Sequence, residues 1–270
     1  PYDFRTTTPN LLGTFDGWID HNADGTKTIV LSGSFTTKSS WISGGNVSGN
    51  ATLPTIPRAT TPALNYPGIF MGTPITVDLS SRASSSFTHT LRYAFGSAAG
   101  TITTKTAATS VQWTPPVSLA TQIPAATWGG CIIYCDTYLG DTLIGTKTAS
   151  FNLVVPDYVV PTVNNVAFQM QSSHPVVTGW GVFVKGFSAA KITATAAGAY
   201  GSAIVSYTFQ LIKDAKVLYE VNQPGNQWTS PVLTEAGGYI AYVVAWDTRG
   251  RHAGAYTSYF SVHDYSAPTV

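Results

Sequence analysis

The chain has 270 residues, which is enough for two or three domains with cores of their own. Only 10% of the residues are charged, and 14 basic against 13 acidic side chains leave a formal net charge of +1. This balance argues against a protein that binds nucleic acid through a basic field, and the absence of any run of about 18 apolar residues predicts no membrane insertion.

Strand signals recur along the whole chain, and a hydrophobic content of 44% in alternating runs indicates packed strands rather than disorder. Turns are expected at Asp24-Gly25, Gly44-Gly45, Gly129-Gly130, Gly237-Gly238 and Arg249-Gly250. Many short strands at this spacing predict an all-β fold of tandem immunoglobulin-like or fibronectin-III-like β-sandwich domains. The expected strands cover 26–35, 74–81, 87–95, 100–106, 131–138, 148–155, 181–186, 191–196, 206–212, 216–221, 238–246 and 256–263.

Two proline-rich junctions, 53–62 and 154–163, divide the chain, because proline removes the donors that a sheet ladder needs. We therefore expect β-sandwich domains at 58–157 and 158–270, preceded by 1–57. The first piece is short for a sandwich, so it is expected to be the C-terminal part of one that is incomplete or completed by another chain. The start on Pro and the end on "YSAPTV" indicate a fragment that runs into a further domain.

The two longer units carry the same motifs in the same order. "VQWTPPVSL" in the first unit corresponds to "NQWTSPVLT" in the second, and "CDTYLGDTLIG" corresponds to "WDTRGRHAG". Trp113 thus matches Trp228, Asp136-Thr137 matches Asp247-Thr248, and Phe151 matches Phe260, and we expect both tryptophans to pack in or between strands. Tandem copies joined by short proline-containing linkers predict a modular rod with limited flexing.

Cys131 and Cys135 are four residues apart in a predicted strand, so their Cα atoms lie about 13 Å apart. A disulfide needs Cα atoms within about 7 Å. We expect two buried free thiols, and this usage indicates folding in a reducing cytoplasm.

The stretch "DHNADG" at 20–25 is typical of the start of a calcium-binding loop. A helix–loop–helix calcium site needs a bidentate Glu at its twelfth position, but Leu31 stands there, inside a predicted strand. We therefore expect a hairpin turn in which Asn22 and Asp24 bond to nearby backbone, with a surface calcium site as the alternative. No other cofactor or metal is expected.

No motif for catalysis is present. The five histidines are scattered, and His89 is expected in a strand at the surface or partly buried. Asp136 and Asp141, which flank a predicted turn, are the pair of carboxylates worth naming for glycoside hydrolysis. We expect a protein without enzymatic activity.

Three tryptophans lie beside glycines, where loops are expected: Trp41, Trp128 and Trp180. An exposed tryptophan in a loop can stack on a sugar or on a partner subunit. Ordinary packing is the alternative for each of them.

The segments "HNADGTKTIVLSGSF", "TIPRA" and "RASSSFTHTL" resemble a family of minor structural or tail proteins of phages and prophages of Gram-positive bacteria. The resemblance extends to "QIP", "AKITATAAGAYGSAIVSYTFQL" and "DTRGR". It covers essentially the whole chain, and its motifs lie at residues 21–28, 55–59, 82–91, 122–124, 191–211 and 247–251. It implies a part of a tail-tip, baseplate or tail-fibre protein, and it assigns no binding residues.

Together these observations predict a non-enzymatic virion component, assembled in the host cytoplasm, that acts as a tail spacer and in attachment to the host surface. The expected partners are other phage tail proteins and a cell-wall glycan or host receptor, and the resemblance implies a homo-oligomer, a trimer or a hexamer. One alternative is a carbohydrate-binding adhesin that recognises a cell-wall glycan through the three tryptophans. Another is an accessory domain of a lytic glycosidase.

Overall fold

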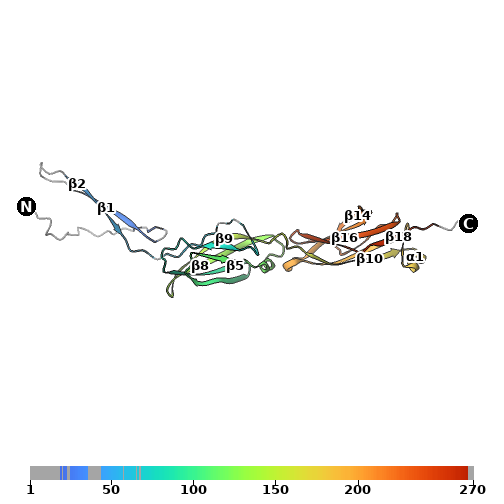
Figure 1. Cartoon of the computed structure of the whole chain (residues 1–270), viewed down its shortest axis with the longest axis horizontal. Coiled ribbons are helices and arrows are strands. Elements are labelled where there is room, and N and C mark those ends of the chain that lie inside the picture. Colours follow the sequence, from blue (N-terminus) through green and yellow to red (C-terminus); the bar gives the residue numbers. More distant parts are fainter. Residues whose placement is uncertain are drawn as a thin grey trace, which may run out of the picture.

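The computed structural model describes residues 19, 21–22, 25–35, 44–56, 58–64, 66 and 68–266. A two-stranded hairpin and two β-sandwiches follow one another along the long axis of the molecule (Figure 1). Helical structure among the described residues is confined to α1 (Pro175–Trp180) and two 3-10 turns, η1 (Val117–Gln122) and η2 (Ala199–Gly201). None of these is long and apolar enough to cross a membrane. The predicted all-β class with tandem sandwiches is confirmed.

The hairpin consists of β1 (Thr28–Phe35) and β2 (Gly45–Thr52), which pair antiparallel with Thr28 opposite Thr52. Val30 and Leu31 are adjacent in β1, so they point to opposite faces, and both are exposed. Among the described residues, the hairpin adds nothing to either sandwich core.

The first sandwich packs the sheet β3-β9-β8-β5-β6 against the pair β4-β7. Alternate residues of β5 and β8 point inward, so that Leu91, Phe95 and Ile133 are fully buried in its core. β3 runs parallel to β9, and the other pairs are antiparallel. The strands are β3 (Gly68–Phe70), β4 (Ile75–Asp78), β5 (Phe87–Phe95), β6 (Ala98–Thr106), β7 (Ser110–Trp113), β8 (Trp128–Leu139) and β9 (Thr142–Val154).

The second sandwich packs the sheet β11-β18-β16-β13-β14, with β17 also paired to β16, against β10-β12-β15. Its core holds Ile192, Phe209 and Tyr239. The strands are β10 (Thr162–Ser172), β11 (Phe183–Val184), β12 (Ser188–Ala197), β13 (Ile204–Lys213), β14 (Lys216–Gln223), β15 (Gln227–Thr229), β16 (Gly237–Asp247), β17 (His252–Tyr256) and β18 (Phe260–His263).

The larger sheets of the two sandwiches share one strand order, apart from the additional β17, and β11 runs parallel to β18 as β3 does to β9. Trp113 on β7 and Trp228 on β15 both pack against their own core, which confirms the packing predicted for them. The two Asp-Thr motifs lie on equivalent strands, but Asp136 is inside β8 whereas Asp247 ends β16. The division of the chain at 57/58 and 157/158 stays a prediction.

Two of the predicted turns are wrong. Gly129-Gly130 lies inside β8, and Gly237-Gly238 opens β16. Gly129 makes room for a neighbouring side chain, since a Cβ there would lie 3.1 Å from the ring of Phe95, whereas a Cβ on Gly130 or Gly238 would meet nothing within 4 Å. Close packing as well as turn geometry therefore places glycines in this chain.

The predicted strand 256–263 is broken in the structure. β17 ends at Tyr256 and β18 begins at Phe260, because the side chain of Thr257 takes part in the ladder in place of backbone. Its hydroxyl oxygen accepts a hydrogen bond of 3.0 Å from the Ala241 N–H group.

Cys131 and Cys135 are buried and free, as predicted. Burial raises the pKa of the Cys131 thiol to about 12 and that of Cys135 to about 11. The prediction for His89 is wrong, because this side chain is fully buried. The two-residue period of β5 places His89 on the core face between Phe87 and Leu91.

Candidate functional site

The predicted turn is confirmed in part: backbone hydrogen bonds close the chain here, but the Asn22 side chain donates to the hydroxyl of Thr26 (3.3 Å) and not to backbone. The Asn22 N–H group donates to the carbonyl oxygen of Thr26 (2.8 Å), and the Gly25 N–H group donates to that of Asn22 (2.9 Å). Gly25 has a φ of +84°, and a Cβ there would lie 2.0 Å from the carbonyl oxygen of Ile56. Asp20 and Asp24 lie outside the described residues, so the calcium alternative stays untested.

The tryptophans proposed as contact residues do not come together. Trp41 lies outside the described residues. Trp128 opens β8 of the first sandwich and is 57% exposed, whereas Trp180 ends α1 of the second and is 50% exposed. The two are therefore separate candidates on different domains.

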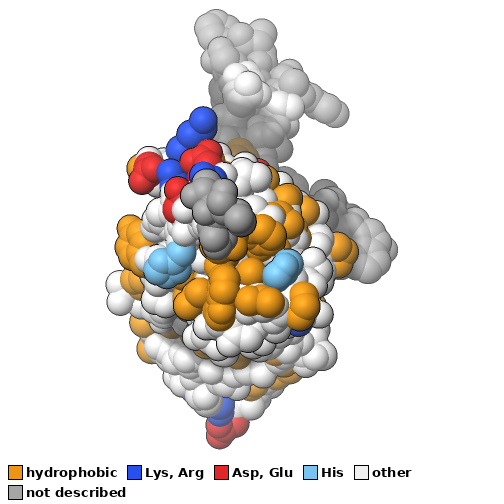
Figure 2. Space-filling view, turned by 90° about the vertical axis from the view of Figure 1, so that its right-hand side faces the viewer, with side chains coloured by type: hydrophobic (Ala, Val, Ile, Leu, Met, Phe, Trp, Pro, Cys, Tyr) orange, Lys and Arg blue, Asp and Glu red, His pale blue; other side chains and the backbone are white. Residues whose placement is uncertain are grey.

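Trp180 belongs to an aromatic hollow of about 220 Å³ at the C-terminal end of the molecule. Its ring centroid is 6.2 Å from that of Tyr265, which is 5.8 Å from that of Phe187. Figure 2 looks onto this end and shows hydrophobic side chains gathered there beside histidines. The remaining lining residues are His174, Val176 and Val177.

The candidate carboxylates are each held by a cation of their own. Arg92 binds Asp136 with two hydrogen bonds of 2.8 and 3.0 Å and lowers the pKa of that carboxyl. Lys105 lies 2.5 Å from Asp141 and lowers its pKa. A general acid of a glycosidase needs a raised pKa, which neither carboxyl has.

The turn between β16 and β17 carries an arginine that joins the two sandwiches. Arg249 is only 7% exposed. Its guanidinium donates to the carbonyl oxygens of Ala120 (2.8 Å) and Ile123 (3.3 Å) in the first sandwich. It also donates to those of Ala199 (2.6 Å) and Tyr200 (3.1 Å) in the second. One buried cation thus binds backbone from both sides of the boundary.

A second arginine of the same turn binds the linker between the domains. Arg251 donates to the carbonyl oxygens of Val155 (2.6 Å) and Val159 (3.0 Å), and also to that of Pro156. It lies 3.3 Å from the exposed carboxylate of Asp157. We call Arg249 and Arg251 with these partners the arginine clamp.

The turn is shaped so that both arginines point the same way. One carboxylate oxygen of Asp247 accepts from the N–H groups of Arg249 and Arg251, at 2.9 Å each. The hydroxyl of Thr248 donates to the carbonyl oxygen of Pro124 (2.7 Å) in the first sandwich. Burial lowers the pKa of Arg249, and the neighbouring Asp247 acts in the opposite direction.

An apolar contact accompanies the clamp. Ala199, in the η2 loop of the second sandwich, packs against the core of the first. The loop is tight, since a Cβ on Gly198 would lie 1.9 Å from the carbonyl oxygen of Ser202. The boundary therefore combines buried polar bonds with a small apolar contact.

Residues 16–270 match the family described as "Siphovirus protein of unknown function (DUF859)". The chain belongs to this siphovirus family. That membership agrees with the resemblance to phage proteins, at the level of the virus group. A search of curated proteins finds no match.

The siphovirus chain is also similar to solved structures of tandem modules. One is described as fibronectin(III)-like modules of Clostridium thermocellum CbhA, with 17% identity, a TM-score of 0.30, and coverage of 76% of this chain and 95% of that one. A second is domains A168–A170 of titin, with 15% identity, a TM-score of 0.38, and coverage of 82% and 72%. A third is chicken CNTN1 FN1–FN3, with 10% identity, a TM-score of 0.30, and coverage of 88% and 90%.

Sequence reasoning on this siphovirus protein did not assign the arginines a role. The signal was the difference between its two copies of one motif. Around the shared glycine, the second copy has Arg249 and Arg251 where the first has Leu139 and Asp141. In a chain with few charged residues, two additional arginines in one turn indicate that this turn makes specific contacts.

Proposed function

We propose that this protein is a non-enzymatic spacer of the phage tail, in which two sandwiches are held end to end at a set distance. The observation that carries the proposal is the burial of the Arg249 guanidinium between the domains. Domains joined by a short linker move relative to one another unless their interface opposes it. A spacer that holds a set distance needs an interface that opposes this movement.

The arginine clamp resists this relative movement because the charge of the Arg249 guanidinium is buried away from water. Hydrogen bonds to a charged group contribute about 1.5–3 kcal/mol each, and a buried cation that loses its partners costs more. Tilting one sandwich away from the other would break the bonds of Arg249 to Ala120 and Ile123. Arg251 meanwhile holds the linker backbone at Val155 and Val159.

The test measures the distance between the sandwiches directly. Spin labels on Thr101→Cys and Lys216→Cys, both exposed strand positions, report it by pulsed electron resonance, because the native thiols are buried. We expect one narrow distance distribution for the unaltered chain and a broad one for Arg249→Ala. Arg82→Ala, a first-domain arginine that bonds to Ala107 instead, is the matched control and should leave the distribution narrow. A narrow distribution in Arg249→Ala would contradict the spacer mechanism.

The tail location is part of the same proposal. It is supported by membership of the siphovirus family and by the extended form of the tandem sandwiches. We expect mass spectrometry to detect the chain in purified virions. We further expect a trimer or hexamer that is bound to other tail proteins of the tail tip, baseplate or fibre. Its absence from purified virions would overturn this placement.

Attachment to a cell-wall glycan is a second candidate function. The observation that favours it is the half-exposed Trp180 in its aromatic hollow. A pull-down on purified cell walls should lose the protein with Trp180→Ala or Trp128→Ala if these residues make the contact. Undiminished binding in both variants would remove the tryptophans from the attachment role.

A further inference from the structure

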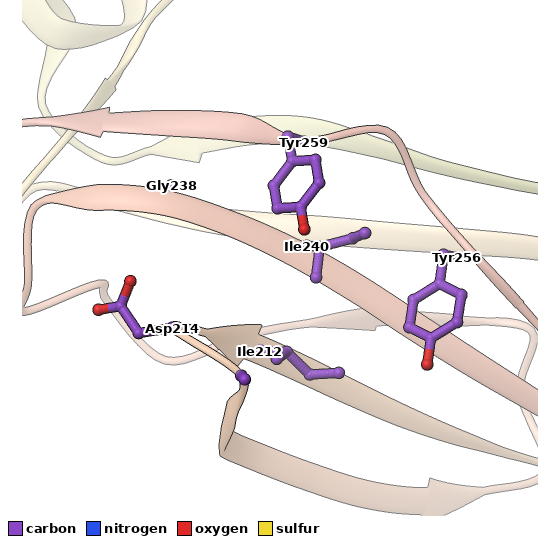
Figure 3. Close-up of a pocket in the computed structure, with 7 residues that line it drawn as sticks. Ile212, Asp214, Gly238, Ile240, Tyr256 and Tyr259 are labelled. Carbon is purple, nitrogen blue, oxygen red and sulfur yellow. The ribbon is translucent and has the colours of Figure 1, made fainter.

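We infer that the second sandwich carries a binding groove for a neutral oligosaccharide, with Tyr256 and Tyr259 as its stacking surfaces. The groove encloses about 680 Å³ on the outer face of the sheet (Figure 3). It rests on the attachment role proposed above, to which it gives a site other than the tryptophans, and it is independent of the spacer role. Its lining residues are Ile212, Asp214, Ala215, Gly238, Ile240, Tyr256 and Tyr259.

The groove exists because the edge of the sheet is broken. β17 pairs with 242–246 of β16 and β18 pairs with 237–239, so Ile240 faces the gap between them. Thr257 bridges the gap by bonding to both backbone groups of Ala241. Tyr256 and Tyr259 therefore stand on either side of Ile240, as Figure 3 shows. In the first sandwich the equivalent β9 runs unbroken along β8.

The two tyrosines are not needed by the fold. Tyr256 is 60% exposed and Tyr259 is 76% exposed. Tyr256 and Tyr259 precede Phe260 by four residues and one residue. At the same positions before the matching Phe151, the first sandwich has Lys147 and Ser150. The related first sandwich, in which β9 is unbroken, thus folds without aromatic rings at these positions. Two large rings kept in water at these positions indicate a ligand.

Polar groups at one end of the groove match sugar hydroxyls. The carboxylate of Asp214 is exposed, and it accepts a hydrogen bond of 2.7 Å from Lys213. Lys213 also lies 3.1 Å from Glu235, so the acceptor is fixed and its charge is balanced. Gly238 has no side chain, and open space lies where its Cβ would be. A sugar ring needs this combination of an aromatic surface for its C–H face and a fixed acceptor for its hydroxyls.

The charges favour a neutral ligand. Asp214 and Glu235 are matched by Lys213 and by Lys216, its register partner across the hairpin, so the turn offers a charged sugar no net charge to bind. The groove is partly open to solvent, which suits a polar ligand better than a buried apolar molecule.

The aromatic surface continues beyond the groove along β16 and β17. Tyr242 pairs with Tyr256 at a centroid distance of 4.4 Å, and Trp246 pairs with His252 at 4.2 Å. Gly254 lets the Tyr242 ring lie over the strand, since a Cβ there would be 2.3 Å from its hydroxyl oxygen. A row of this length fits several sugar units, so we expect affinity to rise with chain length.

The experiment uses the whole chain and an array of neutral oligosaccharides of graded length, with uronic-acid oligosaccharides and purified cell-wall polysaccharide beside them. The test variant is Tyr256→Lys with Tyr259→Ser, which installs the residues of the first sandwich. We expect it to bind about tenfold or more weakly. Tyr259→Phe keeps the ring and should keep most of the binding. Tyr66→Ser, which alters another exposed tyrosine outside both candidate sites, is the control and should bind as the unaltered chain does.

A site-specific readout accompanies the array. The methyl NMR signals of Ile240 and Ile212 should shift on addition of the best oligosaccharide, because they line the groove. Equal sugar binding by the double variant overturns the groove and leaves the attachment role standing. No sugar binding by the unaltered chain overturns both the groove and the attachment role. The same holds if no sugar binds and a tail protein instead occupies the face that carries Tyr256 and Tyr259. None of these outcomes touches the spacer role, which the interdomain distances test.

Discussion

His89 is a single buried residue whose titration should be visible in the stability of the protein. Its Nε2 lies 2.8 Å from the hydroxyl of Thr60, and its Nδ1 has no hydrogen-bond partner among the described residues. Burial lowers the pKa of His89 below its ordinary value of about 6.5, and Arg82 adds to the effect. The unfolded chain therefore binds a proton more readily than the folded one.

The lowered pKa of His89 sets the sign of the pH dependence of stability. Because the folded pKa is the lower one, stability is fully present above about pH 6.5 and is lost as the pH falls through the folded pKa. We expect the melting temperature of the unaltered chain to fall in this window. His89→Gln should be less stable at neutral pH but should lack that part of the slope. A parallel slope in both proteins would show that another group titrates.

Ala215 is strained in the turn between β13 and β14. Asp214 and Ala215 have φ values of 49° and 60°, the left-handed region that a two-residue hairpin turn requires. An alanine held there costs roughly 1 kcal/mol, part of which glycine recovers after its larger entropy loss. Ala215→Gly should raise the free energy of unfolding by about 0.5 kcal/mol in urea titrations. Ala203→Gly, at a position without positive φ, should destabilise instead.

At the scale of the elements, the alternation of apolar and polar residues predicts a strand correctly wherever one face of that strand is buried. β5 begins and ends where the sequence predicts, because Phe87, Leu91 and Phe95 mark its core face. Edge strands gave mixed results: β6 and β14 agree with the predicted strands 100–106 and 216–221, whereas the predicted strand 181–186 is too long. β10 was missed since its residues are largely polar or half-exposed, and β11 is only two residues long. The Gly129-Gly130 pair was misread as a turn because a short-range rule cannot detect the Phe95 ring that packs on Gly129 from another strand.

The glycine pair of β8 offers a matched test of that explanation. A Cβ on Gly129 would lie 3.1 Å from the Phe95 ring and 3.3 Å from Ile123, whereas one on Gly130 meets nothing within 4 Å. Gly129→Ala should therefore lower the free energy of unfolding by about 1 kcal/mol or more. Gly130→Ala should be neutral or slightly stabilising, because alanine suits a strand better than glycine. Equal losses in urea titrations would indicate a turn-like requirement at both positions.

At the scale of the whole molecule, the repeated motifs predict two similar sandwiches, but not how they meet. The boundary is made by backbone carbonyls of Ala120, Ile123 and Val155, whose positions no side-chain pattern encodes. The tyrosine groove escaped for a similar reason, since the strand break beside Thr257 depends on one side chain replacing backbone. Both sites lie where the second copy departs from the first, so comparison of the copies was the available signal.

The chemistry of the clamp makes a prediction for the behaviour of the rod in salt. Screening weakens exposed ion pairs but acts little on buried groups. The partners of Arg249 are carbonyl oxygens around a buried guanidinium, and only the Arg251–Asp157 pair is exposed on its acidic side. We therefore expect the distance distribution between the spin labels to stay narrow as salt is raised, and to stay narrow in Asp157→Ala. Broadening under either condition would mean that the surface ion pair, and not the buried carbonyl bonds, holds the two sandwiches in line.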